Sequence, residues 1–166
     1  YLLLFLKKII KIDRHNNTPY AWRRFRSSFE QKHAKLYPRV GQLNDVPIFS
    51  IDYRMPPDHP FPQAPQDCLI VYRFLIDHID KFMNIKPTNI YLAGDSAGGN
   101  LACSLTGLIL KNKLPAPRGL YLAYPATDLR MTFSPSKINA LTDILLWPSM
   151  LLVCLKSYLS NKLEQV

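Results

Sequence analysis

A glycine-rich stretch in the second half of the chain presents a serine in a setting suited to nucleophilic chemistry. It contains the pattern Gly-x-Ser-x-Gly, in the order Gly94, Asp95, Ser96, Ala97, Gly98, Gly99 and Asn100. An apolar run precedes the pattern and a helical periodicity follows it, which is the context in which such a serine acts as a nucleophile. Chance would produce the pattern roughly 0.01 times in a chain of this composition. We therefore predict that Ser96 attacks a carbonyl carbon.

The spacing of the two outer glycines has a mechanical cause. A serine in a tight turn from strand to helix takes a strained backbone conformation, and small residues two places on either side let the strand and the helix pass closely. Gly94 and Gly98 supply those small residues. We expect the hydroxyl of Ser96 to project alone from the turn. The backbone N–H of Ala97, at the positive end of the helix, is expected to point where a carbonyl oxygen becomes an oxyanion.

Two other interpretations of this stretch are weaker. The first is a glycine-rich turn with an incidental serine, which the low chance frequency disfavours. The second is a loop that binds a phosphate group, because strand, glycines and helix N-terminus also describe a nucleotide site. The chain has neither Gly-x-Gly-x-x-Gly nor the Gly-Lys-Ser/Thr of a Walker loop. We therefore set a nucleotide site aside.

The elements around the serine alternate as in an α/β fold. Apolar, β-branched and aromatic runs predict strands over 46–53, 89–93 and 119–124. Apolar residues at three-and-four spacing predict helices over 63–83 and 100–111. Strand, helix, strand, helix, strand at this spacing indicates two successive βαβ units, whose strands pair in parallel. We therefore predict an α/β fold with a parallel sheet core and flanking helices.

The C-terminal part of the chain predicts short helices. Ser134-Pro135-Ser136 is a typical helix start, and an apolar stretch over 141–155 is interrupted by Pro148. We expect a pair of short helices that pack over the site. The apolar stretch is too short and too broken to cross a bilayer.

The composition indicates a folded domain with a basic N-terminal segment. The 166 residues are 48% hydrophobic and 20% charged, which is an ordinary globular mixture. The formal net charge is +9, and residues 1–45 hold ten Lys or Arg against three acidic residues. We divide the chain into a poorly defined basic segment, 1–45, and a core, 46–166. No nucleic-acid-binding signature accompanies the basic segment, so we expect no nucleic acid partner.

The cysteines and the first residues favour a cytoplasmic location. Cys68, Cys103 and Cys154 stand in apolar runs, with no Cys-x-x-Cys and no metal-ligand spacing. We expect free, buried thiols in a reducing compartment and no metal site. The opening apolar run precedes Lys7 and Lys8, whereas a signal peptide would place its charges first.

Two blocks of the sequence resemble the hormone-sensitive-lipase branch of the α/β-hydrolases. The first is 46–54, Val-Pro-Ile-Phe-Ser-Ile-Asp-Tyr-Arg, with the Pro-Phe-Pro loop that follows it. The second is 94–100, Gly-Asp-Ser-Ala-Gly-Gly-Asn. Further similarity runs through 114–129 and through the Phe-Ser-Pro-Ser of 133–136, so the resemblance covers residues 46–160.

The resemblance implies a partial α/β-hydrolase fold, incomplete at both ends, that hydrolyses carboxylic esters. It implies that Ser96 is the nucleophile, that an acyl-enzyme forms on it, and that the N–H of Ala97 donates to the oxyanion. The other residues of the implied nucleophile elbow are Gly94, Asp95, Gly98 and Gly99. Lipid or small esters are the implied substrates, with no metal or organic cofactor. The resemblance also allows association with lipid droplets or a membrane surface.

The groups that activate such a serine are not evident in this chain. In this fold the triad acid and then the histidine follow the serine. All four histidines instead precede Ser96, namely His15, His33, His59 and His78. Asp128 and Asp143 follow Ser96, but both come too early to be the family's triad acid. We do not expect His59 to replace the missing base, because the resemblance makes it an ordinary member of a His-Pro-Phe-Pro loop.

The second oxyanion donor of the family is missing as well. A His-Gly-Gly-Gly loop supplies it in the family, whereas only Gly41 precedes Gly94 here. Because loss of one such donor costs about 10²–10³ in kcat, we expect very low esterase activity from this polypeptide alone. We interpret the chain as a fragment of a hydrolase or an altered gene product. The alternative is a catalytically inactive relative whose basic N-terminal segment and apolar C-terminal helices bind a lipid surface or a protein partner.

Overall fold

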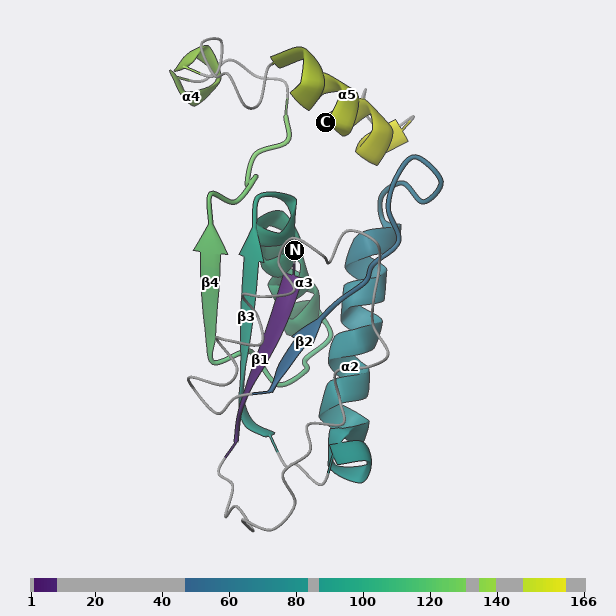
Figure 1. Cartoon of the computed structure of the whole chain (residues 1–166), viewed down its shortest axis with the longest axis vertical. Helices are drawn as coiled ribbons and strands as arrows, with labels where there is room; N and C mark the ends of the chain where they lie inside the picture. The colour runs from purple at the N-terminus through teal and green to yellow at the C-terminus, as the bar shows by residue number, and fades with distance from the viewer. Residues whose placement is uncertain (1, 9–46, 84–86, 131–134, 140–147, 161–166) are drawn as a thin grey trace.

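The computed structural model describes residues 2–8, 47–83, 87–130, 135–139 and 148–160. In these ranges it shows a sheet with helices packed against it (Figure 1). The strands are β1, Leu2–Lys8; β2, Ile48–Ser50; β3, Pro87–Asp95; and β4, Gly119–Ala123. The helices are α2, Gln63–Met83; α3, Ala97–Lys111; α4, Pro135–Asn139; and α5, Pro148–Leu159. The predicted α/β class is confirmed.

The two strands that flank α3 pair as the sequence predicts. β3 and β4 run parallel, in one register that begins with Tyr91 opposite Gly119 and ends with Asp95 opposite Ala123. A parallel pair needs a long crossover connection, and α3 supplies it. The carboxyl ends of both strands therefore meet at one edge of the sheet, where the predicted turn lies.

The remainder of the sheet is mixed rather than parallel. The strand order is β2-β1-β3-β4, and β1 runs antiparallel to both of its neighbours. The expected direct pairing of the strand at 46–53 with the strand at 89–93 is therefore wrong. An apolar run such as the one at the start of the chain suits a strand between two neighbours. The direction of β1 depends on the connection that follows it, and no local pattern encodes that connection. Residues 9–46 lie outside the described residues.

The second strand is shorter than predicted because the chain turns away toward α2. Only Ile48–Ser50 pairs in the sheet, whereas the prediction covered 46–53. Beyond it, the backbone N–H of Arg54 donates to Asp67 Oδ2 at 3.0 Å, and the Arg54 side chain donates to the same carboxylate, with Nη2 2.7 Å from Oδ1. These bonds tie the loop after β2 to the first turns of α2.

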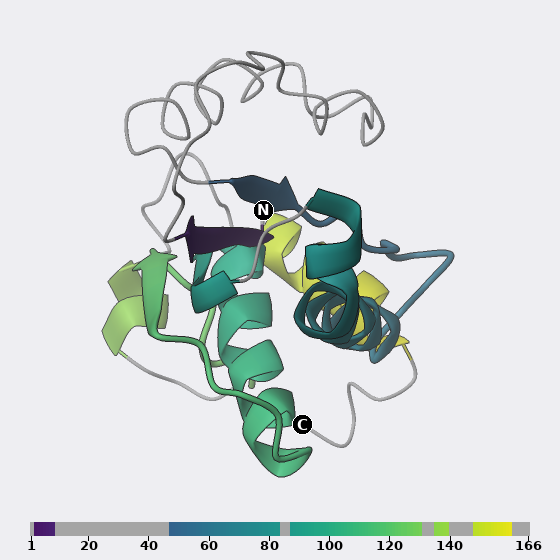
Figure 2. The same ribbon diagram turned by 90° about the horizontal axis from the view of Figure 1, so that it is seen from below.

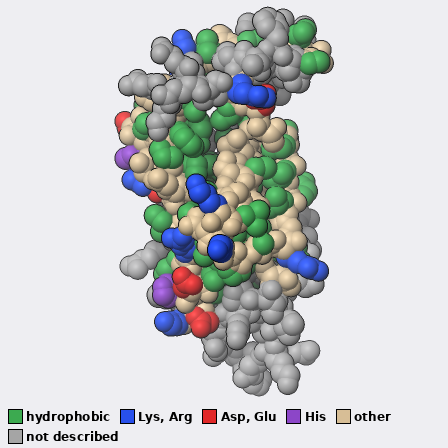
Figure 3. Space-filling view, turned by 180° about the vertical axis from the view of Figure 1, so that it is seen from behind, with side chains coloured by type: hydrophobic (Ala, Val, Ile, Leu, Met, Phe, Trp, Pro, Cys, Tyr) green, Lys and Arg blue, Asp and Glu red, His purple; other side chains and the backbone are tan. Residues whose placement is uncertain are grey.

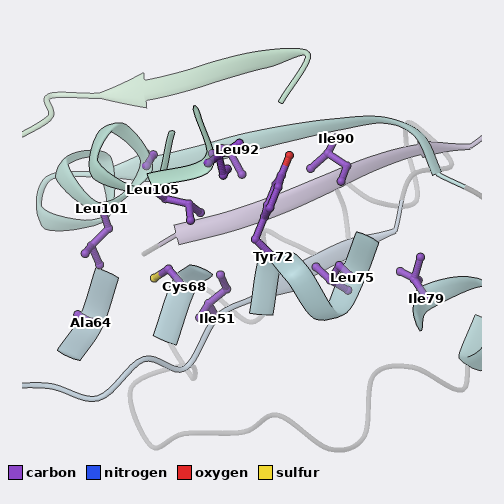
Figure 4. Close-up of a cluster of buried hydrophobic side chains, with 12 residues drawn as sticks. Ile51, Ala64, Cys68, Tyr72, Leu75, Ile79, Ile90, Leu92, Leu101 and Leu105 are labelled. Carbon is purple, nitrogen blue, oxygen red and sulfur yellow. The ribbon is translucent and has the colours of Figure 1, made fainter. Parts of the chain in front are cut away.

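α2 and α3 lie side by side on one face of the sheet (Figure 2). Both helices follow the predicted periodicity, and α3 begins three residues earlier than predicted. The buried residues of α2 recur at three-and-four spacing, and those that form the core are Ala64, Cys68, Tyr72, Leu75 and Ile79. The buried hydrophobic side chains of α3 are Leu101, Ala102, Leu105 and Ile109. With Leu92 of β3 they make one apolar cluster (Figure 4).

The polar atoms inside this cluster are satisfied or neutral. The hydroxyl of Tyr72 donates to the carbonyl oxygen of Pro115 at 2.7 Å. Burial raises the pKa of Tyr72 to about 12 and the pKa of the Cys68 thiol to about 12, so both groups are uncharged at neutral pH. Cys68 is thus the free, buried thiol that we expected.

The burial expected for the other two cysteines is partly wrong. Cys103 is half-buried on α3, and Cys154 is exposed. Cys154 belongs to α5, whose buried side chains are Leu155 and Leu159. These two residues share one face of the helix, and Cys154 lies outside that face.

The two C-terminal helices lie beyond the carboxyl ends of β3 and β4 (Figure 1). α5 begins at Pro148, where a proline ring is compatible with the first helical turn. The N–H of Phe61 donates to the carbonyl of Tyr158 at 2.7 Å, and the two rings meet edge to face with centroids 5.8 Å apart. The predicted pair of short helices is therefore present. Within the described ranges, no helix combines the length and apolarity needed to cross a membrane.

Apolar side chains also remain on the outer surface. Seen from behind, hydrophobic side chains form patches between charged ones (Figure 3). The large exposed ones on α2 and α3 are Ile70, Phe74 and Leu110. Burial is thus confined to one stripe of each helix.

Truncation of Leu105 tests the core. Leu105→Ala should lower the free energy of unfolding by about 2–5 kcal/mol, because Leu105 is fully buried and the vacated space stays partly unfilled. Leu110→Ala is the matched control on the same helix, since Leu110 is 60% exposed, and it should change stability by less than about 0.5 kcal/mol. Urea denaturation measures both. Equal effects of the two variants would contradict the assignment of the buried face.

The Arg54–Asp67 pair predicts an acid-sensitive contribution to stability. Hydrogen bonds from Arg54 hold the pKa of Asp67 below its ordinary value of 3.8. The folded state therefore favours the ionised carboxylate of Asp67. The resulting contribution to folding stability is fully present above the ordinary pKa, and it is lost as the pH falls through the lowered pKa of the folded state. The stability difference between the wild type and Asp67→Asn should be largest above about pH 5 and shrink under acid. Asp77→Asn, an exposed carboxylate on α2, is the control; a wild-type to Asp67→Asn difference that stays constant down to pH 3 would count against the pair.

Candidate active site

The turn between β3 and α3 places Ser96 alone at the carboxyl edge of the sheet. β3 ends at Asp95 and α3 begins at Ala97, so Ser96 is the single residue between them. Its backbone angles are φ 50° and ψ −117°, in a region that a residue with a side chain rarely adopts. The side chain is exposed. The strained strand-to-helix turn that the sequence predicts is therefore present.

The glycines permit a contact that no other residue could make. A Cβ atom added to Gly94 would lie 2.3 Å from the carbonyl oxygen of Gly98, which is backbone and cannot move aside cheaply. A Cβ atom on Gly99 would lie 2.7 Å from the Cβ of Pro125, in the segment that follows β4. Strand, helix and following loop thus touch through their backbones. This close approach forces the change of direction at Ser96.

Ala97 supplies a backbone donor at the same turn. It is the first residue of α3 and is exposed. The first N–H groups of a helix have no carbonyl acceptor within that helix, and they carry its positive dipole end. A negatively charged oxygen near Ser96 could accept a hydrogen bond from such a group.

The segment after β4 holds the turn from the other side. The N–H of Ser96 donates to the carbonyl of Ala123 at 3.0 Å, and the N–H of Ala126 donates to the carbonyl of Ser96 at 3.2 Å. The side chain of Asn100 donates from Nδ2 to the carbonyl of Ala126 at 2.7 Å. No role for Asn100 or Ala126 was predicted from the sequence. The local signals at Asn100 were its place one helical turn after Ser96 and its position at the end of the 94–100 block.

Tyr124 is a further residue at this edge that the sequence analysis did not single out. It follows β4 directly, has a φ of 36°, and is 75% exposed. Its hydroxyl lies 3.5 Å from Oδ2 of Asp95, at the outer limit of a hydrogen bond. Tyr124 and Asp95 therefore lie close to each other beside the turn.

None of the described histidines reaches the serine. His59 is exposed in the loop before α2, and His78 is exposed on α2, where its ring packs 5.4 Å from that of Phe74. No hydrogen bond joins either one to Ser96 among the contacts of the described residues. His15, His33 and Asp143 lie outside the described residues.

The carboxylate after β4 is engaged elsewhere. Asp128 accepts hydrogen bonds from the Arg130 side chain, the shortest at 2.9 Å. Within the described ranges, no three His, Cys, Asp or Glu side chains gather as a metal site. The described part of the site therefore consists of a serine, backbone donors and the groups that hold them.

A family model described as "alpha/beta hydrolase fold" matches residues 27–165 of the chain. The hormone-sensitive lipase of Mus musculus is 36% identical over 140 residues, and that of Homo sapiens is 40% identical over 140 residues. Each alignment covers 84% of this chain, but the chain spans only 18% of the mouse protein and 13% of the human one.

A solved structure agrees with this match. A Pyrobaculum calidifontis esterase is similar with a TM-score of 0.74 and 26% identity, over 82% of this chain and 45% of that one. The similarity therefore extends from the sequence motifs to the arrangement of strands and helices.

Substitution of Gly94 tests the close contact at the turn. Gly94→Ala should lower the free energy of unfolding by at least about 2 kcal/mol, since the new methyl group would collide with the backbone of Gly98. Gly107→Ala is the matched control, because Gly107 lies within α3 with no atom close to its added Cβ, and it should stabilise the helix by about 0.5–1 kcal/mol. Denaturant titrations measure both variants. Tolerance of Gly94→Ala would mean that strand and helix do not pass this closely.

Proposed function

The chain belongs to the α/β-hydrolase fold family, and on that premise we propose that it carries the nucleophile of a serine hydrolase that cleaves carboxylic esters. One observation carries the proposal. Ser96 stands exposed in a strained turn, directly before the first backbone N–H of α3. This arrangement offers an attacking oxygen and an oxyanion donor on neighbouring residues, which acyl transfer requires.

The proposed reaction has two halves that meet at Ser96. In the first half, Oγ attacks the ester carbonyl carbon, the carbonyl oxygen becomes an oxyanion beside the N–H of Ala97, and the alcohol leaves. In the second half, water attacks the acyl-serine and the carboxylic acid is released. In the first half the hydroxyl proton must pass to a base and from that base to the oxygen of the leaving alcohol, because a serine hydroxyl is a weak nucleophile on its own. The resemblance assigns that role to a histidine later in the family's sequence than the serine.

Among carboxylic esters, we propose lipid esters as the substrate class. Relatives with 36% and 40% identity are named hormone-sensitive lipases, and an Acinetobacter venetianus relative with 30% identity is named an esterase. Large exposed apolar side chains on the two C-terminal helices, Ile138, Met150 and Val153, would suit a lipid-facing surface. A cytoplasmic location with association to lipid droplets belongs to the same proposal.

A second candidate is a catalytically inactive relative that binds a lipid surface or a protein partner. It is favoured by the lack of a hydrogen bond between Ser96 and the described histidines, together with the exposed apolar side chains of α5. Sedimentation with anionic vesicles that depends on the basic residues of segment 1–45, without ester hydrolysis, would favour this candidate.

Covalent labelling tests the proposed nucleophile. In the full-length natural protein, a fluorophosphonate probe should react at Ser96, and Ser96→Ala should reduce labelling at least about a hundredfold because, among the described residues, Ser96 is the one serine that stands between a strand and a helix. Ser149→Ala is the control, since Ser149 is exposed on α5 and is not part of the turn between β3 and α3. Peptide mass spectrometry locates the adduct. Labelling that persists in Ser96→Ala would end the proposal.

A further inference from the structure

Asn100 joins two segments of the chain behind the turn. It lies on α3 one helical turn after Ser96, and its side-chain Nδ2 donates to the carbonyl oxygen of Ala126 at 2.7 Å. That carbonyl can only accept, so the amide must present its nitrogen to it. The contact spans 26 residues of sequence and is partly buried. It fastens the segment after β4 to the helix that carries the oxyanion donor.

The same segment then contacts the backbone of Ser96. The N–H of Ala126 donates to the Ser96 carbonyl oxygen at 3.2 Å, and the N–H of Asn100 donates to the same oxygen at 3.1 Å. Three hydrogen bonds therefore close a ring through Asn100, Ala126 and Ser96. The Ser96 carbonyl oxygen is held by two donors that approach from different elements.

The direction of this carbonyl sets the direction of the Ala97 N–H. The carbonyl of Ser96 and the N–H of Ala97 belong to one planar peptide unit, and in a trans peptide they point to opposite sides. Fixing the oxygen toward Ala126 therefore fixes the Ala97 hydrogen away from Ala126. Without the hydrogen bond from Ala126, rotation of the Ser96–Ala97 peptide would be favoured because it relieves the strain of the positive φ at Ser96.

We infer that Asn100 is a positioning residue that fixes the Ser96–Ala97 peptide and so aims the Ala97 N–H at the oxyanion. This inference rests on the proposed function for its catalytic consequence. Asn100 itself does not touch the reacting atoms in this account. Asn100 is expected to act on the transition state, because the negative charge on the carbonyl oxygen of the ester substrate, which the Ala97 N–H stabilises, develops there.

Amide exchange tests the structural part of the inference without activity. In Asn100→Ala, hydrogen exchange at the Ala126 N–H should become at least about tenfold faster, because the segment loses its anchor to α3. Asn100→Asp has nearly the same size and replaces the donor with an oxygen, so it should act in the same direction and serves if the alanine variant does not fold. Asn112→Ala is the matched control, since Asn112 lies at the other end of α3 and bonds Leu108 and Arg73. Unchanged exchange at Ala126 in both Asn100 variants would overturn the inference.

Kinetics of the full-length natural protein test the catalytic part. With a short p-nitrophenyl ester, Asn100→Ala should lower kcat by about tenfold to a hundredfold and leave KM within about twofold, because a displaced oxyanion donor affects the transition state rather than substrate binding. Asn112→Ala should leave both constants unchanged. An unchanged kcat in an Asn100 variant whose Ala126 exchange has quickened would also overturn the inference. If wild-type Ser96 is not labelled at all, the proposed function fails, and the exchange measurement alone decides whether Asn100 holds this peptide.

Discussion

The described structure depends on how closely β3 and α3 pass each other at Gly94 and Gly98. No side chain fits between the two backbones there, since even a methyl group on Gly94 would collide with a main-chain oxygen. The chain must reverse within one residue, and Ser96 absorbs the strain in its positive φ. The cost of that conformation is offset by the surrounding packing. Leu101, Ala102 and Leu105 bury the face of α3 that follows the turn.

The parallel pairing of β3 with β4 brings the other half of the site into place. Because the two strands end together, the segment after β4 lies against the turn and contacts both its backbone and the glycine at position 99. The hydrogen bonds of Ser96, Ala126 and Asn100 then form a continuous support for the turn. Ser96 and Ala97 remain exposed at the turn, with the exposed Tyr124 near them. The proposed chemistry thus depends on backbone groups as well as on the serine, and it needs few other side chains.

Features encoded in local sequence were predictable, and features set by distant contacts were not. The bounds of α2 follow from its apolar spacing, and the serine turn follows from its glycines and flanking periodicities. The early start of α3 was missed because Gly98 and Gly99 disfavour helix, although the close packing at the turn overrides that preference. No strand was predicted over Leu2–Lys8, because a short apolar run does not by itself encode a strand, and it encodes still less the direction in which that strand pairs. The bond between Asn100 and Ala126 joins residues 26 apart, and no pattern within either segment predicts it.

The central claim is that Ser96 and the Ala97 N–H act on one carbonyl group. A crystal structure of the full-length natural protein after reaction with a fluorophosphonate tests it most directly, because the phosphonyl oxygen stands in for the oxyanion. We predict phosphorus bonded to Oγ of Ser96 and a phosphonyl oxygen about 2.7–3.1 Å from the nitrogen of Ala97. An adduct on another residue, or a phosphonyl oxygen turned away from Ala97, would contradict it.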